Sequence, residues 1–239
     1  MVAIFGPTGV GKTAVATCLA GLLRERGEDP VAISADALQV YEGLETLTGA
    51  ATPAQRAQLE HRLIGVVPLS EPFSVGGYMR LAHAEIDSLL AAGRRPIVVG
   101  GTGLYLRAAL ADLSLEKPPA GASSELWSPD TRHPSVVFGL VMERSALYSR
   151  IEQRVDAIVA AGAEAEVRAA DAAGTSRTAR KALGFDQLLI GDVDGLKRRT
   201  RNYARRQLTW MRKMPGVHTI DMTGRSPVEA AAEIAGLLP

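Results

Sequence analysis

A glycine-rich loop close to the start of the chain constrains the fold more than any other feature of the sequence. The loop reads Gly6, Pro7, Thr8, Gly9, Val10, Gly11, Lys12 and Thr13. A short apolar run precedes it and a helical pattern follows it, which is the context that a phosphate-binding P-loop requires. In a P-loop, backbone amides and the helix N-terminus bind a polyphosphate. We therefore predict a polyphosphate site here, with Lys12 on the phosphate oxygens and Thr13 as a ligand of Mg²⁺.

Strand and helix signals alternate along the chain. Buried strands are predicted at residues 2–5, 31–34, 63–67, 96–99, 136–141 and 217–220. Helices are predicted at residues 12–26, 74–92, 144–161, 163–173, 176–190, 194–213 and 226–238, with one more after Gly103. This alternation predicts an α/β fold: a P-loop NTPase-like parallel sheet flanked by helices, with additional C-terminal helices. We expect residues 1–113 and 135–239 to form the core and the Pro/Gly/Ser-rich residues 114–134 to be a linker.

The composition of the chain indicates the cellular compartment in which the protein works. The chain has 239 residues, a net charge of +1 and one cysteine, Cys18. A single cysteine excludes a disulfide within the chain and a cysteine-based zinc site, and it suits a reducing environment. No apolar run approaches the length that spans a bilayer, and the first run is too short for a signal peptide. We expect a cytoplasmic protein that does not associate with membranes.

Polar residues follow two of the predicted strands. Asp36 comes just after residues 31–34, and Thr102 comes just after residues 96–99. Ligands of a parallel sheet bind beyond the carboxyl ends of its strands, so both side chains are expected to face the P-loop. Asp36 can accept a proton or help to hold Mg²⁺. The predicted strand at residues 96–99 runs into two glycines. NTP hydrolases usually have a metal-binding aspartate there, so its absence disfavours that class of enzyme.

The predicted helix at residues 194–213 has a strongly basic face. Residues 196–213 include eight basic residues and no acidic residue. At 100° per residue seven of them form two adjacent stripes: Arg198, Arg201, Arg205 and Arg212, and then Arg199, Arg206 and Lys213. Such a face can bind the phosphates of a substrate or of a nucleic acid. The alternative is a solvated face that is paired with acids from other elements.

Five blocks of the sequence together resemble the tRNA dimethylallyltransferase family. They are residues 6–13, 33–41, 70–75, 98–106 and 199–210. Weaker similarity at residues 142–159 and 182–185 extends the resemblance over most of the chain, whereas a P-loop kinase would share only the first block. The resemblance implies transfer of a dimethylallyl group from dimethylallyl diphosphate to the N6 amine of an adenosine next to the tRNA anticodon. Diphosphate would be the second product.

The resemblance also implies a role for each matching residue. The P-loop, Gly6 to Thr13, would hold the donor with Mg²⁺ and stabilise the leaving diphosphate. Asp36 would accept the proton of the attacking amine, and Thr102 would contact the substrate. The target adenosine would pack against Ala37, Leu38 and Gln39.

The basic helix supplies the remaining candidates. Arg201 and Arg205 are predicted to reach either the diphosphate or the RNA backbone. Arg198 and Arg206 are predicted to bind RNA. We expect the protein to act as a monomer.

The chain departs from the family after the helix that follows Gly103. Family members that modify tRNA carry a sizeable helical insertion there, and only residues 114–134 stand in its place. The chain could therefore bind tRNA with a smaller footprint, prenylate a free adenine nucleotide as adenylate isopentenyltransferases do, or be a relative with little activity. The blocks at residues 35–41 and 205–210 favour tRNA. A small-molecule kinase and a non-enzymatic RNA-binding module are the alternatives outside the family.

Overall fold

The described part of the structure, a computed structural model, comprises residues 1–114 and 125–239. Within these residues, six strands form one sheet: β1 (Val2–Phe5), β2 (Pro30–Ser34), β3 (His61–Arg62), β4 (Arg95–Gly100), β5 (Val136–Val141) and β6 (Val217–Asp221). Their order is β3-β2-β4-β1-β5-β6, and every neighbouring pair is parallel. The predicted α/β class with a parallel sheet is therefore confirmed.

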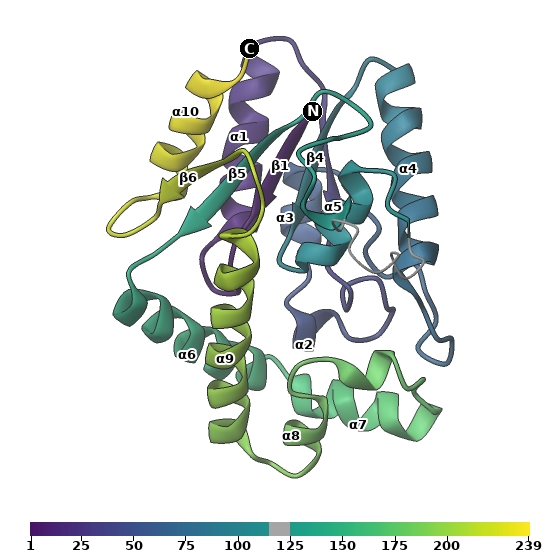
Figure 1. Cartoon of the computed structure of the whole chain (residues 1–239). Coiled ribbons are helices and arrows are strands. Elements are labelled where there is room, and N and C mark those ends of the chain that lie inside the picture. The colour runs from purple at the N-terminus through teal and green to yellow at the C-terminus, as the bar shows by residue number, and fades with distance from the viewer. Residues whose placement is uncertain (115–124) are drawn as a thin grey trace.

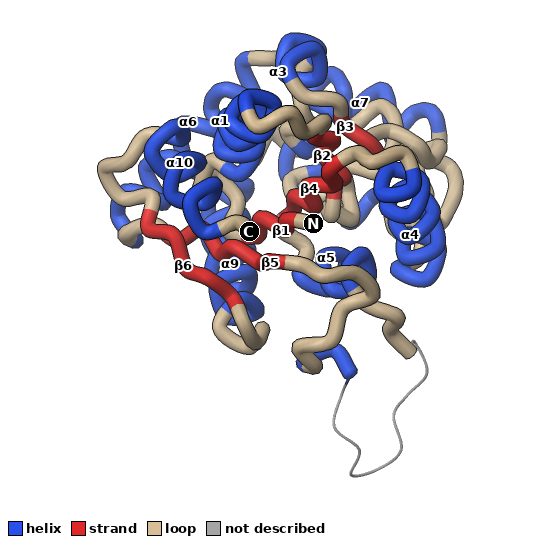
Figure 2. Tube along the Cα trace, turned by 90° about the horizontal axis from the view of Figure 1, so that it is seen from above, coloured by secondary structure: helices blue, strands red, loops and turns tan. Residues whose placement is uncertain are grey.

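Helices cover both faces of the sheet (Figures 1 and 2). They are α1 (Lys12–Glu25), α2 (Glu45–Thr48), α3 (Pro53–Gln58), α4 (Val75–Ala91), α5 (Gly103–Leu110), α6 (Arg144–Ala160), α7 (Ala163–Ala173), α8 (Phe185–Leu189), α9 (Val193–Met211) and α10 (Pro227–Leu237). Two 3₁₀ turns, η1 (Glu125–Trp127) and η2 (Ala179–Lys181), complete the described elements. Figure 2 shows α1 and α10 on one side of the strands and α4 and α5 on the other.

The sheet needs both layers because its inner strands β1 and β2 are buried along their whole length and almost entirely apolar. All four residues of β1 and all five of β2 are buried, as expected for parallel strands covered on both faces. One apolar cluster joins the sheet to α4 and α5, and a second joins it to α1 and α10. The loops that follow β1, β2 and β4 therefore leave the same edge of a rigid sheet.

A smaller helical layer lies at that edge. Figure 1 shows α6, α7 and α8 beyond the carboxyl ends of the strands, with α9 running from this layer back to the sheet. A third apolar cluster, which includes Leu47, Val155, Val167, Phe185 and Leu196, connects these helices to α2. The layer therefore has a core of its own and stands over the loops that carry the candidate site.

The predicted strand at residues 63–67 is wrong. Leu63 has a φ of 61° and Gly65 also has a positive φ, which an extended strand does not allow. Leu63, Ile64 and Val67 are buried all the same, because this segment packs against the loop after β2, whereas Val66 is exposed. Its amides at Gly65 and Val66 donate to the carbonyls of Gln39 and Val40 at 2.9 and 2.7 Å. The pairing strand is shorter and lies just before, at β3.

The predicted helix at residues 176–190 is also wrong as one unit. The chain forms η2, turns through Gly184 with a φ of 100°, and then forms α8. Hydrogen bonds from outside the segment fix this break. The Thr178 hydroxyl accepts from the Tyr41 hydroxyl at 2.7 Å and from the Phe73 amide at 3.1 Å. Tertiary contacts have overridden the local helical pattern here.

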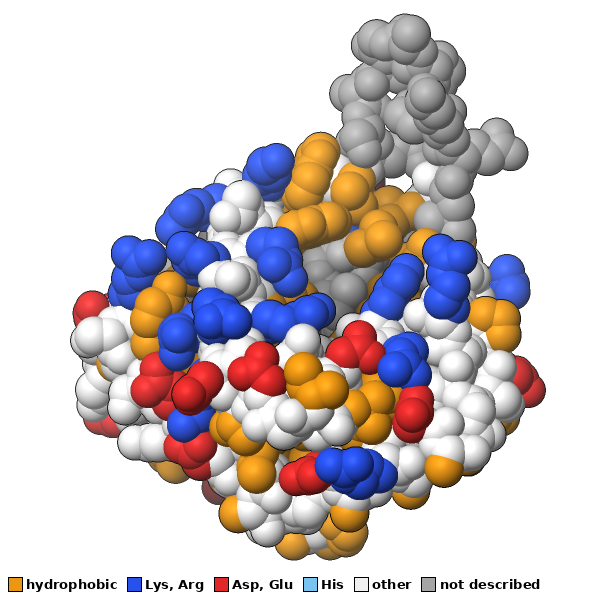
Figure 3. All heavy atoms as spheres, turned by 90° about the horizontal axis from the view of Figure 1, so that it is seen from below, with side chains coloured by type: hydrophobic (Ala, Val, Ile, Leu, Met, Phe, Trp, Pro, Cys, Tyr) orange, Lys and Arg blue, Asp and Glu red, His pale blue; other side chains and the backbone are white. Residues whose placement is uncertain are grey.

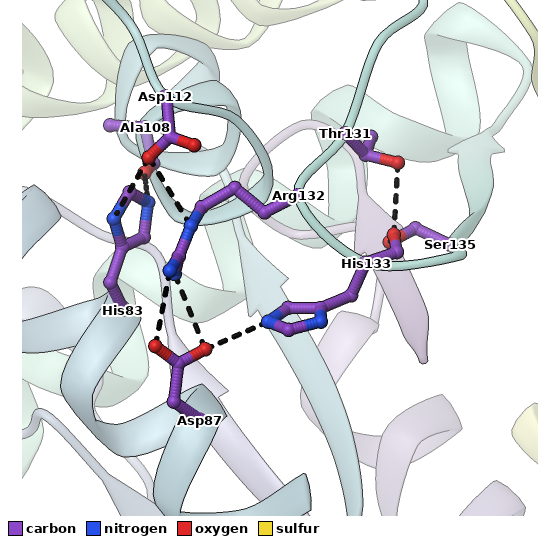
Figure 4. Close-up of polar contacts among 8 residues, drawn as sticks. All are labelled: His83, Asp87, Ala108, Asp112, Thr131, Arg132, His133 and Ser135. Carbon is purple, nitrogen blue, oxygen red and sulfur yellow. Dashed lines mark hydrogen bonds and ion pairs between the residues drawn. The ribbon is translucent and has the colours of Figure 1, made fainter.

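Residues 115–124 of the predicted linker lie outside the described residues. The segment that follows them is held firmly on α4 and α5 (Figure 4). Arg132 pairs with Asp87 at 3.1 Å and with Asp112 at 3.2 Å, and His133 contacts Asp87 at 2.7 Å. His83 contacts Asp112 and the carbonyl of Ala108. The chain thus re-enters the core at a fixed position before β5.

Candidate functional site

A cavity of about 570 Å³ opens at the carboxyl edge of the sheet. Its walls come from the P-loop, the loop after β2, the end of β4, and helices α6 and α9. Parallel sheets bind ligands at this edge, beside the strand where the chain order reverses, and β1 is that strand here. The cavity is therefore in the position that the sequence predicted for a polyphosphate site.

Backbone geometry of the P-loop gives it the shape of an anion cradle. Thr8, Gly9, Gly11, Lys12 and Thr13 line the cavity, whereas Gly6, Pro7 and Val10 are buried beneath it. Gly9 and Gly11 have φ angles of 85° and 103°, a left-handed conformation that favours glycine. Gly11 is the N-cap of α1. Because glycine has no side chain, the amides at the helix N-terminus face the cavity without a side-chain cap.

Lys12 is folded back over this loop. Its Nζ donates to the carbonyls of Gly6 and Pro7 at 2.9 and 3.0 Å. Burial lowers the pKa of Lys12 to about 8, and the nearby carboxylate of Asp36 partly opposes that shift. A bound polyanion would favour the charged ammonium, so the lysine is prepared to gain a proton when a phosphate ligand enters.

Asp36, Ala37 and Thr102 form a connected corner of the site. Oδ1 of Asp36 accepts from the Leu38 amide at 3.0 Å, and Oγ1 of Thr102 accepts from the Ala37 amide at 3.2 Å. Oδ2 of Asp36 has no hydrogen-bond partner within residues 1–114 and 125–239. Asp36 lines the cavity with Lys12, so an acid and a cation face the same space from two strands.

Leu38 and Gln39 complete the wall beyond Asp36. Both line the cavity. The Gln39 amide group is held between the Ser34 hydroxyl, at 3.0 Å, and the Gly49 carbonyl, at 3.5 Å. The loop after β2 thus presents a fixed, mixed apolar and polar surface next to the carboxylate.

Gln207 of α9 ties two loops of the site together, although the sequence analysis assigned it no role. Its side-chain oxygen accepts from the Thr8 amide at 2.8 Å, and its side-chain nitrogen donates to the Gly101 carbonyl at 2.8 Å. A Cβ on residue 101 would lie 2.3 Å from this nitrogen, so only glycine admits the bridge. Gln207 is 4% exposed. The carboxamide therefore fixes the P-loop relative to the loop that carries Thr102.

Replacing Gln207 by Ala should lower kcat by about 10²-fold, because donor and acceptor groups would lose their alignment. It should also lower the free energy of unfolding by about 1–3 kcal/mol, since a buried amide and a buried carbonyl lose their partners. Steady-state kinetics and thermal denaturation measure the two effects. Gln58→Ala, at an exposed position of α3, is the control. Unchanged kcat in Gln207→Ala would contradict this role.

Tyr203 also reaches the site from α9. Its hydroxyl lies 3.4 Å from Oγ1 of Thr102, and its side chain lines the cavity. Burial, together with the charge of Asp36, raises the pKa of Tyr203 to about 12, so the phenol stays protonated. The site therefore has an aromatic wall next to its carboxylate.

Two arginines of α6 also line the cavity. They are Arg150 and Arg154. Arg154 donates to the Thr48 carbonyl at 2.9 Å, and its guanidinium occupies the place that a side chain at Gly49 would fill. Burial lowers the pKa of Arg154, and Asp36 opposes the shift. Their spacing of four residues on a predicted helix was the available signal, but it did not show which way that face points.

The predicted arginines of α9 lie elsewhere. Arg201 pairs with Glu152 of α6 at 2.7 Å, outside the cavity wall. Arg205 is exposed and donates to the neighbouring Asn202. Arg198 and Arg206 are exposed as well. None of these four side chains lines the cavity, and binding of RNA by any of them stays a prediction.

The oxygen atoms at the cavity suit a metal ion that takes some of its ligands from the protein and the others from a substrate. The described residues contain no group of three or more His, Cys, Asp or Glu side chains that could hold a metal ion. Thr13 lines the cavity from the first turn of α1. Mg²⁺ commonly takes few protein ligands and completes its shell with phosphate oxygens and water. The site therefore fits Mg²⁺ only together with a bound polyphosphate.

No helix in the part of the chain that the structure describes is long and apolar enough to cross a membrane.

Comparison with known families and proteins agrees with the geometry. The sequence model of the IPP transferase family matches residues 39–133 and 121–214, and an isopentenyl transferase model matches residues 1–71. The tRNA dimethylallyltransferase of Kineococcus radiotolerans is 32% identical over 306 aligned positions, which cover 100% of this chain and 96% of that enzyme. That of Pseudarthrobacter chlorophenolicus is 33% identical over 295 positions, covering 97% of each.

A solved structure extends the comparison to three dimensions. The full-length tRNA isopentenylpyrophosphate transferase of Bacillus halodurans superposes with a TM-score of 0.85 at 29% identity, covering 98% of this chain and 94% of that one. Family models, relatives and fold lead to one conclusion: the chain belongs to the IPP transferase family.

Proposed function

We propose that this protein transfers a dimethylallyl group from dimethylallyl diphosphate to the N6 amine of an adenosine next to the anticodon of tRNA. The observation that carries the proposal is the shared cavity, in which the P-loop cation Lys12 and the carboxylate of Asp36 face the same space. The relatives named tRNA dimethylallyltransferase favour this activity over a kinase or a free-nucleotide transferase.

The donor diphosphate fits the cradle of the P-loop. The amides at the start of α1 and the ammonium of Lys12 would neutralise the charge that builds on the diphosphate as the C–O bond breaks. Arg150 and Arg154 would face the same phosphates from α6. Mg²⁺ would be held by the phosphate oxygens and the Thr13 hydroxyl, and its charge would further favour departure of the diphosphate.

The acceptor amine would approach from the side of Asp36. The N6 nitrogen attacks the allylic carbon, a C–N bond forms as the C–O bond to diphosphate breaks, and the amine proton passes to the Asp36 carboxylate. The hydroxyl groups of Thr102 and Tyr203 lie 3.4 Å apart beside this carboxylate and would orient the adenine. Leu38 and Gln39 would form the wall against which the nucleoside packs.

Donor affinity should fall as the pH rises above about 8. The free protein holds Lys12 with a pKa of about 8, and a bound diphosphate would raise that pKa. Binding therefore requires proton uptake above pH 8 and none by this lysine well below it. Titration calorimetry with dimethylallyl diphosphate between pH 6.5 and 9.5, in buffers of different ionisation enthalpy, measures this. Lys12→Arg, which does not titrate in this range, should remove the dependence. Affinity that stays constant across pH 8 in the parent protein would contradict the assignment.

We further propose that residues 1–113 and 135–239 act as one monomeric cytoplasmic catalytic unit, with only the short stretch at residues 114–134 in place of an insertion. The alignment with the K. radiotolerans enzyme has more positions than this chain has residues, 306 against 239, so that enzyme carries residues without a counterpart here. The two matches to the IPP transferase model meet at residues 121–133, within this stretch.

The test is a diphosphate-release assay with purified protein and Mg²⁺. Diphosphate should appear only when dimethylallyl diphosphate and unmodified tRNA are both present. Release that depends on AMP, ADP or ATP instead of tRNA would favour the adenylate branch. Transfer of phosphate from ATP without any use of the prenyl donor would favour a kinase and would overturn the proposal.

A further inference from the structure

One stripe along α9 alternates cations with aromatic rings. It consists of Arg199, Tyr203, Arg206, Trp210 and Lys213, and we refer to it as the cation–aromatic stripe. The members are spaced by four, three, four and three residues, which keeps them within an arc of about 80° on a helix, over a length of about 21 Å. Cations exposed to solvent and rings that are partly buried follow one another along its whole length.

Contacts within the stripe hold the rings beside the cations. The Arg206 guanidinium lies 5.5 Å from the centre of the Tyr203 ring. The Trp210 ring lies 4.7 Å from that of Trp127, which comes from η1, and the Lys213 ammonium lies 5.6 Å from the Trp127 ring. Trp127 thus widens the aromatic surface at the end of the stripe.

The start of α5 anchors this surface to the reaction site. A Cβ on residue 103 would lie 2.3 Å from the Trp210 ring, so Gly103 lets the indole pack directly against the backbone next to Thr102. Arg107 holds the backbone on both sides of Trp127: it is 5% exposed and donates to the carbonyls of Leu126 and Asp130 at 3.1 and 3.3 Å. The rings are therefore set in place before any ligand arrives.

The cations of the stripe differ from the other cations of α9. Lys197 and Arg201 face α6 and are paired with Asp156 at 2.6 Å and Glu152 at 2.7 Å. Arg199, Arg206 and Lys213 form no ion pair with any residue in the described ranges. No acidic residue occurs between Gly195 and Ile220 either. Figure 3 shows Lys and Arg side chains gathered on one part of this face, with hydrophobic side chains beside them.

We propose that the cation–aromatic stripe, with Trp127, binds the single-stranded nucleotides that flank the acceptor adenosine of the RNA. Aromatic rings stack on bases irrespective of sequence, and neighbouring cations follow the phosphates, which is the common way in which proteins hold single strands. A stretch of about 21 Å accommodates several nucleotides. The inference rests on the proposed function, because it takes the acceptor to be an unpaired loop of RNA.

Tyr203 connects the stripe to the chemistry. It is the second member of the stripe and it lines the cavity beside Thr102. A base that enters the cavity at Tyr203 would leave its neighbours on the strand along the helix, toward Arg199 on one side and toward Trp210 and Lys213 on the other. The stripe thereby gives this chain an RNA-binding surface on its catalytic domain.

Intrinsic fluorescence tests the proposal directly. The chain has two tryptophans, Trp127 and Trp210, so fluorescence excited at the long-wavelength edge, where tyrosine does not absorb, reports only from the proposed platform. The protein is titrated with an unmodified anticodon stem-loop RNA whose loop contains the acceptor adenosine, and separately with a blunt RNA duplex of equal length. Quenching that saturates with the stem-loop and is absent with the duplex is expected. Equal quenching by both would overturn the proposal.

Substitutions then separate the stripe from its surroundings. Trp127→Ala should weaken stem-loop binding by about tenfold or more, and Trp127→Phe should largely preserve it, because stacking needs a ring. Lys213→Ala and Arg206→Ala should each weaken binding by about fivefold. Each should also reduce the slope of log K against log salt concentration by about one, because one counterion fewer is released. Arg212→Ala is the matched control: it removes an exposed cation next to Lys213, but from another face of the helix. Melting temperatures identify any variant that fails to fold.

The outcomes distinguish the stripe from the proposed function. Suppose that the parent protein prenylates the RNA and that the Ala variants at positions 127, 206 and 213 bind and react like Arg212→Ala. The proposed role of the stripe in RNA binding is then wrong, and the proposed transferase activity stands. If the parent transfers no prenyl group but binds the stem-loop with this dependence on the stripe, the RNA-binding surface stands and the proposed reaction fails.

Discussion

Replacing Asp36 by Asn is expected to lower kcat by about 10²- to 10⁴-fold, with little change in the KM for the prenyl donor. This range is the usual contribution of a general base, and the substitution removes the base without changing its size. Asn can still accept the hydrogen bond that Asp36 takes from the Leu38 amide, so the loop should keep its conformation. Rapid quench with radiolabelled donor measures the chemical step, apart from product release.

Asp29→Asn provides the control for this experiment. Asp29 precedes β2 and Asp36 follows it, so the two acids sit at opposite ends of one strand. Asp29 is exposed and pairs with Arg94 at 2.6 Å, a surface interaction that contributes little to stability. Turnover by Asp36→Asn at the parent rate would mean that another group accepts the amine proton.

Replacing Lys12 by Ala is expected to lower kcat by about 10²- to 10³-fold and to weaken donor binding as well. The lysine is the one side chain of the P-loop that brings a full positive charge to the leaving diphosphate, and such charge acts most strongly in the transition state. Its burial indicates that its charge is poorly screened by water. Steady-state kinetics with varied donor concentration separate the two effects.

Arg24→Ala is the matched change on the same helix. Arg24 lies in the last turn of α1 and donates to the Gln58 carbonyl at 2.9 Å, at the opposite end of the helix that Lys12 begins. Its loss should leave both kcat and KM near the parent values. If Lys12→Ala keeps the parent kcat, the cradle holds something other than the leaving group.

The sequence predicted those parts of the site that depend on local pattern. A strand, a glycine-rich loop and a helix occur consecutively, so the position of Lys12 and Thr13 at the sheet edge followed from period and spacing alone. Asp36 and Thr102 could be placed beside them because parallel strands end at a common edge. In the structure Lys12, Thr13 and Asp36 line one cavity, and Thr102 lies beside its wall, where its hydroxyl accepts from the Ala37 amide at 3.2 Å.

The sequence did not predict features that depend on packing between distant elements. Gln207 bridges Thr8 and Gly101 because α9 crosses the sheet edge, and periodicity cannot give that crossing. Arg201 was grouped with Arg205 on one stripe, but Arg201 pairs with Glu152 of α6. Helical period defines which residues share a face, whereas only the tertiary fold defines what that face meets.

The glycines after β4 illustrate the same limit. Their pattern was equally compatible with a tight turn and with a substrate loop. None of Gly100, Gly101 and Gly103 has a positive φ. They are glycines because the Ala35 carbonyl, Gln207 and the Trp210 ring approach where side chains would be. Close approach of this kind leaves no periodic signal in a sequence.

The central claim is that this short chain modifies an adenosine of tRNA. It is tested most directly by competition in one tube, with radiolabelled dimethylallyl diphosphate, Mg²⁺, unmodified tRNA and AMP at equal concentrations. After nuclease digestion and chromatography, the label should be found in a modified adenosine from the position next to the anticodon, and it should be lost with Asp36→Asn. Label in AMP alone, with none in tRNA, would contradict the account and would assign this fold and this cavity to a free nucleotide.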